Sequence, residues 1–248
     1  IAWSWVWWIP RILSTYEVII LKPILDVLLG LIGALGPGLA AVYMLNRTEG
    51  RASLGAFFKQ GWSLRFNAML LAPAVMIMPV IGVIAGLFLQ VTGTDNPWQY
   101  SLLALTGYPP VLTVAALLAG AIGQEIGWRG FALKRILRNT PPIQAAIFVG
   151  TIWSIWHLPL FLINGTTQNA LAKFGLLPAF FGYMLYTVML SILITLLFVK
   201  CNANIFGSIL FHTVSNLSQG VLPLIFSKNG AMIELLILCM VTAGFVYG

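Results

Sequence analysis

Apolar residues dominate this chain of 248 amino acids: 60% are hydrophobic, 8% are charged, and the mean hydropathy is +0.96. A soluble domain of this length needs a charged surface, so the composition excludes a soluble globular protein. The net charge is +7, but the basic residues lie between apolar segments, where they set membrane topology rather than bind nucleic acid. The sequence therefore predicts an all-α, polytopic transmembrane helix bundle whose partner is the lipid bilayer.

Apolar segments long enough to cross a bilayer recur along the whole chain. A membrane helix needs about 20 mostly apolar residues, and by that criterion the sequence predicts seven or eight spans. The first segment is interrupted by charged residues and Pro23, and the second contains Gly36-Pro37-Gly38, which favours a broken or tilted helix. The predicted segments are 12–32, 33–46, 67–91, 108–133, 143–164, 174–199, 204–226 and 230–247.

Basic residues are distributed unevenly over the connections between these segments. They follow the second, fourth and sixth segments, whereas the connections around Asp95 and around 164–169 carry little positive charge. Connections rich in Lys and Arg stay in the cytoplasm, so this alternation predicts which connections are cytoplasmic. The basic residues concerned are Arg47, Arg51, Lys59, Arg65, Lys134, Arg135, Arg138 and Lys200.

Three of the apolar segments contain ionisable and amide side chains at helical spacing. Such groups are costly at membrane depth and are functional candidates by default. Glu125 and Arg129 are four residues apart and share a helical face, as do His212 and Asn216. Each set also has a structural explanation, as a buried salt bridge, an interhelical hydrogen bond or an interfacial histidine. Their joint occurrence predicts a site formed by Gln124, Glu125, Arg129, His157, His212 and Asn216.

The depth of these residues can be counted from the basic connections. At about 1.5 Å per helical residue, Glu125 lies roughly 13 Å inward from Lys134. His212 lies at a similar depth, counted from the start of its own segment, and His157 lies deeper, at about 20 Å. These depths predict a polar cavity in the cytoplasmic leaflet, with the reactive groups toward the cytoplasmic side.

The candidate residues also carry a family resemblance. Residues 124–131, Gln-Glu-Ile-Gly-Trp-Arg-Gly-Phe, resemble the Glu-Glu-x-x-x-Arg motif of the CAAX protease and bacteriocin-processing (CPBP) intramembrane peptidases, relatives of the Ras-converting CAAX endopeptidase. Trp153-x-x-x-His157 and His212-x-x-x-Asn216 are similar to the second and third motifs, in the family's order. The resemblance implies a single intramembrane peptidase domain over 1–248 that hydrolyses lipidated or hydrophobic peptides near their C-terminus, as in CAAX-type prenylated substrates.

The resemblance also implies roles for the site residues. In the family the leading glutamate activates the attacking water, the second-motif histidine positions it, and the third-motif histidine and asparagine stabilise the oxyanion. Arg129 would then hold in place the two glutamates with which the family's first motif begins, at positions 124 and 125 of this chain. This chain has Gln124 at the leading position, and an amide of nearly the same shape cannot act as a base. The chain is therefore expected to be inactive, either as an engineered variant or as a natural pseudo-enzyme, unless Glu125 itself does the work.

A metal site and two other classes of protein remain as alternatives. Glu125, His157 and His212 form a two-histidine, one-carboxylate set that suits zinc. Against zinc, a His-Glu-x-x-His helix is absent and the asparagine suits an oxyanion hole, so no cofactor is expected and zinc is the alternative. A transporter or channel would also place polar groups in helices, although no inverted repeat is evident. A non-catalytic immunity or scaffold protein would be consistent with Gln124.

Overall fold

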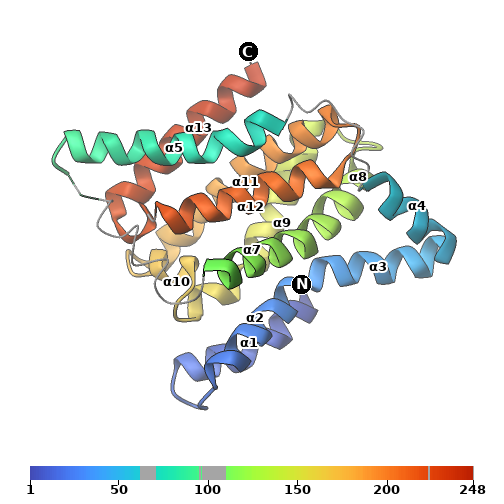
Figure 1. Cartoon of the computed structure of the whole chain (residues 1–248), viewed down its shortest axis with the longest axis horizontal. Helices are drawn as coiled ribbons and strands as arrows, with labels where there is room; N and C mark the ends of the chain where they lie inside the picture. The colour runs from blue at the N-terminus through green and yellow to red at the C-terminus, as the bar shows by residue number, and fades with distance from the viewer. Residues whose placement is uncertain (62–70, 95, 97–109, 223, 248) are drawn as a thin grey trace.

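Helices account for all regular secondary structure in the part of the chain that the computed structural model describes, residues 1–61, 71–94, 96, 110–222 and 224–247. The predicted all-α class is confirmed (Figure 1). In chain order the elements are α1 (Ala2–Thr15), α2 (Pro23–Ala34), α3 (Gly36–Glu49), α4 (Arg51–Gly61), α5 (Leu71–Val91), α7 (Pro110–Glu125), the π-helix η3 (Ile126–Leu133), α8 (Lys134–Ile136), α9 (Pro142–Trp156), the 3₁₀ helix η4 (Leu158–Leu162), α10 (Thr167–Ala172), α11 (Leu176–Lys200), α12 (Ile205–Val221), the 3₁₀ helix η5 (Leu224–Phe226) and α13 (Lys228–Tyr247).

Four helices of the described residues are long and apolar enough to cross a membrane: α5, α9 continued by η4, α11 and α13. The pair α2 and α3, bent by 42°, forms a fifth candidate, so the predicted segment 33–46 is part of a bent pair rather than a span of its own. The Gly-Pro-Gly sequence, which favoured a broken or tilted helix, lies in the first turn of α3, directly after the bend. α12 has 17 residues and is about 25 Å long, slightly less than the hydrocarbon core. The count of seven or eight spans is thus not confirmed. Residues 67–70 and 108–109 of two predicted segments, with Arg65 and Asp95, lie outside the described residues.

The predicted span 12–32 is wrong. Two helices, α1 and α2, occupy this region and pack against each other across a turn. Glu17 in the turn adopts a positive φ of 60°, and Pro23 begins α2, where a proline is well tolerated. The guanidinium of Arg11 donates to both carboxylate oxygens of Asp26 over 2.8 and 2.9 Å, which ties the two helices together. The charged residues that interrupt the apolar segment therefore form a hairpin.

The remaining helices pack around α7, α9, α11 and α12, which run through the middle of the bundle (Figure 1). α9 lies along α11, and their contact is close at Gly150, where an added Cβ would come within 2.8 Å of the Cα of Val188. Ser191 of α11 also donates to the carbonyl of Ala146 over 2.8 Å. Small residues that allow such close backbone approach are typical of membrane helix interfaces.

α3 approaches the segment that carries the first motif at a second close contact. An added Cβ on Gly127 would lie 2.5 Å from the backbone of Pro37, and one on Gly38 would lie 2.6 Å from the carbonyl oxygen of Gly123. Glycine is needed at these positions because backbone, not a movable side chain, occupies the space. The bend between α2 and α3 thus places α3 directly against the start of η3.

Candidate active site

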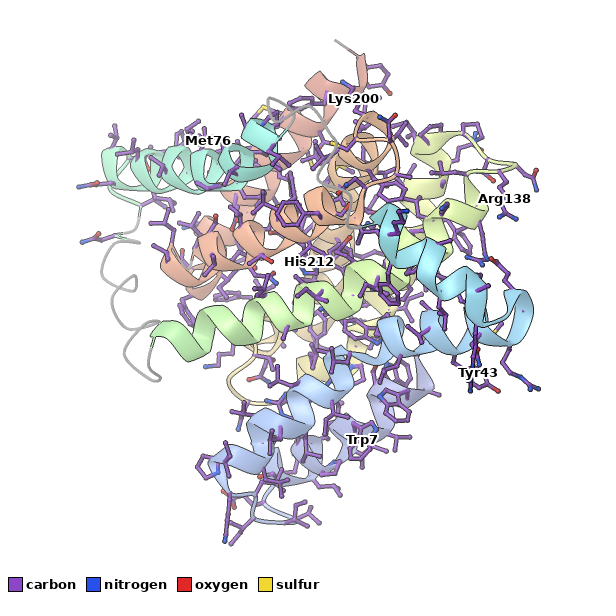
Figure 2. All side chains as sticks on the ribbon, turned by 45° about the vertical axis from the view of Figure 1, so that its right-hand side comes forward. Trp7, Tyr43, Met76, Arg138, Lys200 and His212 are labelled. Carbon is purple, nitrogen blue, oxygen red and sulfur yellow. The ribbon has the colours of Figure 1, made fainter. Side chains whose placement is uncertain are left out.

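Four elements bring the candidate residues together. Gln124 and Glu125 end α7, Arg129 lies in η3, His157 directly follows α9, and His212 with Asn216 lies on one face of α12. Figure 2 shows His212 near the middle of the bundle. A cavity of about 490 Å³ has, on one wall, the side chains of Gln124, Trp153, His157, His212 and Asn216.

Glu125 and Arg129 lie behind that wall and are fully buried. One oxygen of Glu125, Oε1, accepts a hydrogen bond from Nη1 of Arg129 over 2.9 Å and lies 2.8 Å from Nδ1 of His212. The guanidinium of Arg129 also stacks over the ring of Trp153, 4.7 Å from its centroid. These contacts offset part of the cost of burying both charges. Glu125 therefore does not line the cavity and contacts it only through His212.

Gln124 does line the cavity, and Trp153 fixes its orientation. The indole Nε1 of Trp153 donates to Oε1 of Gln124 over 2.8 Å, in a buried contact. A carboxylate of the same shape can accept this bond through one oxygen and keep the second oxygen for another partner. The surroundings of position 124 are therefore compatible with glutamate as well as glutamine.

Both histidines are anchored through Nδ1. Nδ1 of His157 lies 2.8 Å from the carbonyl oxygen of Trp153, which can only accept, so Nδ1 carries the proton. Nδ1 of His212 donates in the same way to Glu125, whose carboxylate is paired with Arg129. In each neutral ring this assignment leaves the lone pair on Nε2. Nε2 is therefore the atom of each ring that remains for chemistry.

The residues present do not fit a three-ligand zinc site. Neutral histidines that donate through Nδ1 can ligate a metal through Nε2. A third ligand is lacking, because position 124 is an amide and Glu125 is turned inward onto Arg129. Within the described ranges, His, Cys, Asp and Glu side chains form no group of three that could hold a metal ion. Cys201 and Cys239, the chain's two cysteines, are both free thiols.

The cavity is also lined by residues that sequence reasoning missed. Nε2 of Gln168 in α10 donates to the hydroxyl of Tyr183 in α11 over 2.8 Å, and the ring of Tyr183 lies 5.3 Å from that of His157. Lys173, after α10, and Gln219 of α12 line the cavity too. Gln168 lies in a stretch predicted only as a connection, and Tyr183 is one aromatic residue in an apolar segment. Neither carries a motif that could have signalled a site.

Comparisons with known proteins agree with the motifs. The family described as Type II CAAX prenyl endopeptidase Rce1-like matches residues 106–218, which include every candidate site residue. The CAAX prenyl protease 2 of Methanococcus maripaludis is 25% identical over 222 residues, which cover 86% of this chain and 79% of that protein. With the apolar helices, these matches support an integral membrane protein of the intramembrane endopeptidase type. The resemblance predicted from the three motifs is confirmed, and the chain is similar to the Rce1-like CAAX prenyl endopeptidases.

Proposed function

We propose that this chain is an intramembrane endopeptidase whose catalytic position is occupied by Gln124, and that glutamate at this position makes it active. Its substrates would be lipid-anchored peptides, CAAX-type prenylated ones among them, cut near the C-terminus. The observation that carries the proposal is the shared cavity: Gln124, His157, His212 and Asn216 come from three helices and line one space among apolar helices. Polar groups at such depth are functional candidates.

Each residue has a role that follows from its contacts. A glutamate at position 124 takes a proton from water, whose oxygen attacks the scissile carbonyl carbon, and later delivers that proton to the leaving amine. Nε2 of His157 accepts a hydrogen bond from the same water and orients it. The amide of Asn216 donates to the developing oxyanion. Hydrolysis then needs only groups that line the cavity.

His212 can donate to the oxyanion only as an imidazolium, because its Nδ1 proton is committed to Glu125. The Glu125 carboxylate stabilises that charged ring, as the buried carboxylate of a catalytic triad stabilises its histidine. Arg129 fixes the carboxylate from the other side. Glu125 and Arg129 are therefore positioning residues. The groups that act on the substrate are a glutamate at position 124, His157, His212 and Asn216.

An apolar cavity beside the active site supports a lipid-anchored substrate. This second cavity, of about 170 Å³, shares Tyr183, Tyr186 and Gln219 with the first. It lies between α10, α11 and α13, so an apolar chain can reach it from the surrounding bilayer. We propose that it receives the hydrophobic anchor while the peptide occupies the larger cavity. By the same depth count as above, His212 lies about 12 Å inward from the basic end of α12, in the cytoplasmic half.

A cleavage assay tests the function. In nanodiscs, Gln124→Glu should cleave a farnesylated peptide at least 10²–10⁴-fold faster than the unchanged chain, the usual worth of a positioned base. Gln168→Glu, which adds a carboxylate elsewhere in the lining of the same cavity, is the matched control and should remain inactive. An unprenylated peptide of the same sequence measures the contribution of the lipid. Equal activity of the unchanged chain and Gln124→Glu would contradict the role of position 124 and point to Glu125.

We also propose that no metal takes part. Every step above is assigned to a side chain of the cavity, and Gln124→Glu should keep its rate after exhaustive treatment with 1,10-phenanthroline. Reversible loss of activity, together with one zinc ion per purified protein, would instead show that zinc is required. His157, His212 and the glutamate introduced by Gln124→Glu would then be its ligands. If no peptide is cut and the protein in liposomes transports solute, the transporter alternative holds. If the protein binds peptide without cleaving it and without solute flux, the immunity or scaffold alternative holds.

A further inference from the structure

A single fixed charge faces the larger cavity. Of the described residues that line it, Lys173 is the only Asp, Glu, Lys or Arg. Its side chain is exposed at the edge of the cavity and takes part in none of the ion pairs found among the described residues. Lysine often lies near a helix C-terminus because it interacts with the helix dipole. α10, which Lys173 follows, has only six residues, so this effect is small, and it does not require the side chain to line a cavity.

Hydrogen bonds hold α10, which Lys173 follows, in a fixed relation to His157. Thr166, the N-cap of α10, donates to the carbonyls of Leu160 and Ile163, and it accepts from the backbone of Asn169. The side chain of Asn169 donates to the carbonyl of Phe161 over 3.0 Å. These contacts tie α10 to η4, the element that directly follows His157. The backbone that carries Lys173 is therefore anchored to the segment that directly follows His157.

We propose that Lys173 binds the C-terminal carboxylate of the peptide substrate and so sets the distance from that terminus to the cleaved bond. The inference rests on the proposed function. A cavity whose only fixed charge is positive attracts an anion, and a peptide that enters with its C-terminal end carries one such group whatever its sequence. The Asn169 and Gln168 side chains, which also line the cavity, are further hydrogen-bonding groups for the terminal residues.

Binding of the carboxylate at Lys173 fixes the distance from the C-terminus of the peptide to the cleaved bond. An extended chain advances about 3.3–3.6 Å per residue, so a carboxylate held at Lys173 fixes which peptide bond reaches Asn216 and His157. The position of cleavage should then be counted from the C-terminus rather than from the lipidated side chain. Adding one residue to the C-terminus of a peptide should move the cleaved bond by one residue, and the released fragment should keep its length.

Binding to the unchanged chain tests the inference without requiring hydrolysis, because Gln124 leaves the cavity intact. By fluorescence anisotropy, a labelled farnesylated peptide with a free carboxylate should bind about tenfold or more tightly than the same peptide with a C-terminal amide. Lys173→Gln should abolish this difference, and Lys173→Arg should retain it. Lys200→Gln, which removes an exposed positive charge at the other end of the bundle, should retain it too. Equal affinity for acid and amide, or an unchanged preference in Lys173→Gln, overturns the proposal.

Cleavage by Gln124→Glu separates this inference from the proposed function. The amide peptide should show a raised KM with little change in kcat, because Lys173 binds the terminus and does not touch the reacting atoms. Equal kcat/KM for acid and amide leaves the peptidase proposal in place and rejects the role of Lys173. A carboxylate preference in binding without any cleavage supports Lys173 and rejects the peptidase proposal.

Discussion

One oxygen of Glu125 serves two buried partners, and this arrangement gives the residue a structural as well as a chemical role. Arg129 and His212 both contact Oε1, whereas Oε2 has no hydrogen-bond partner among the described residues. A carboxylate in this position cannot reach a water in the cavity, because its side chain is fully buried. The geometry thus favours position 124, which faces the cavity, as the place for a general base.

Removal of Arg129 should destabilise the protein strongly. Arg129→Ala leaves the Glu125 carboxylate buried without its cation, which typically costs about 3–5 kcal/mol. The thermal unfolding midpoint in detergent measures this loss, with Arg138→Ala at an exposed site as the control. If the two variants unfold at the same temperature, the buried pair does not stabilise the fold in the way its geometry indicates.

The oxyanion role of α12 can be tested in the Gln124→Glu background. Asn216→Ala should lower kcat by roughly 10²–10³-fold, the usual cost of removing one oxyanion donor, with little change in KM. His212→Ala should have an effect of the same order. Steady-state kinetics with a farnesylated peptide separate the two constants. A raised KM at unchanged kcat would assign Asn216 to substrate binding instead.

The three motifs predicted which side chains meet, because residues four apart on a helix share a face and polar groups avoid lipid. The motifs did not predict that Gln124 and Glu125, adjacent in sequence, point to opposite sides of the cavity wall. That division depends on the positions of Trp153, which orients Gln124, and of Arg129, which draws Glu125 inward. Such partners come from tertiary packing, which periodicity does not encode.

At the level of the elements, the close contact between α9 and α11 sets the relative position of His157 and Tyr183. Gly150→Ala would place a methyl group 2.8 Å from the Cα of Val188 and 2.9 Å from the Cβ of Ser191. The two helices must then move apart, at a cost of about 1–3 kcal/mol.

Gly244→Ala is the matched control, because this α13 glycine is exposed and has no atom within 4 Å of an added Cβ. It should leave stability unchanged or raise it by up to about 1 kcal/mol, as alanine favours helix. Unfolding midpoints of the two variants measure the difference. Equal midpoints would mean that α9 and α11 adjust to the extra methyl group without loss.

The elements that sequence reasoning missed are short ones between apolar segments. α10 has six residues and lies between Gly165 and Gly175, whose φ angles of +80° and +113° suit glycine. Its polar residues read as a connection because their helical period is too short to detect. The α1–α2 hairpin was missed for the opposite reason: apolar residues on both sides of Glu17 and Lys22 suggested one continuous span.

For the molecule as a whole, the basic connections and the far end of the cavity lie on opposite sides. Arg138 precedes α9 and Lys200 precedes α12, whereas the cavity extends to residues beyond the C-terminal ends of these helices, including the exposed Gly165 and Phe226. Figure 1 shows α8 and α10 at opposite ends of the bundle. The predicted topology therefore gives a cavity that begins in the cytoplasmic half and extends away from the cytoplasm.

Cysteine labelling in intact bacterial cells tests this topology. In a background without Cys201 and Cys239, Arg138→Cys should react with a membrane-impermeant maleimide only after the membrane is opened. Asn164→Cys, exposed near α10, should react from outside. The reverse pattern would show that the bundle has the opposite orientation, with the cavity directed toward the cytoplasm. Labelling of both sites from one side would contradict the assignment of α9 as a span.

The π-helix η3 has a consequence for how this protein can change during evolution. A π-turn holds one more residue than an α-turn, and each residue rotates a helix by about 100°. The extra residue thus sets the angle between Gln124, which faces the cavity, and Arg135, which pairs with Glu49 near the basic end. Loss of one codon after Arg129, at position 131 or 132, would remove the extra residue, leave Gln124, Glu125 and Arg129 at their present spacing, and turn the basic surface away from Glu49. Descendants could in this way exchange the contacts at one end of the bundle while inheriting the chemistry unchanged.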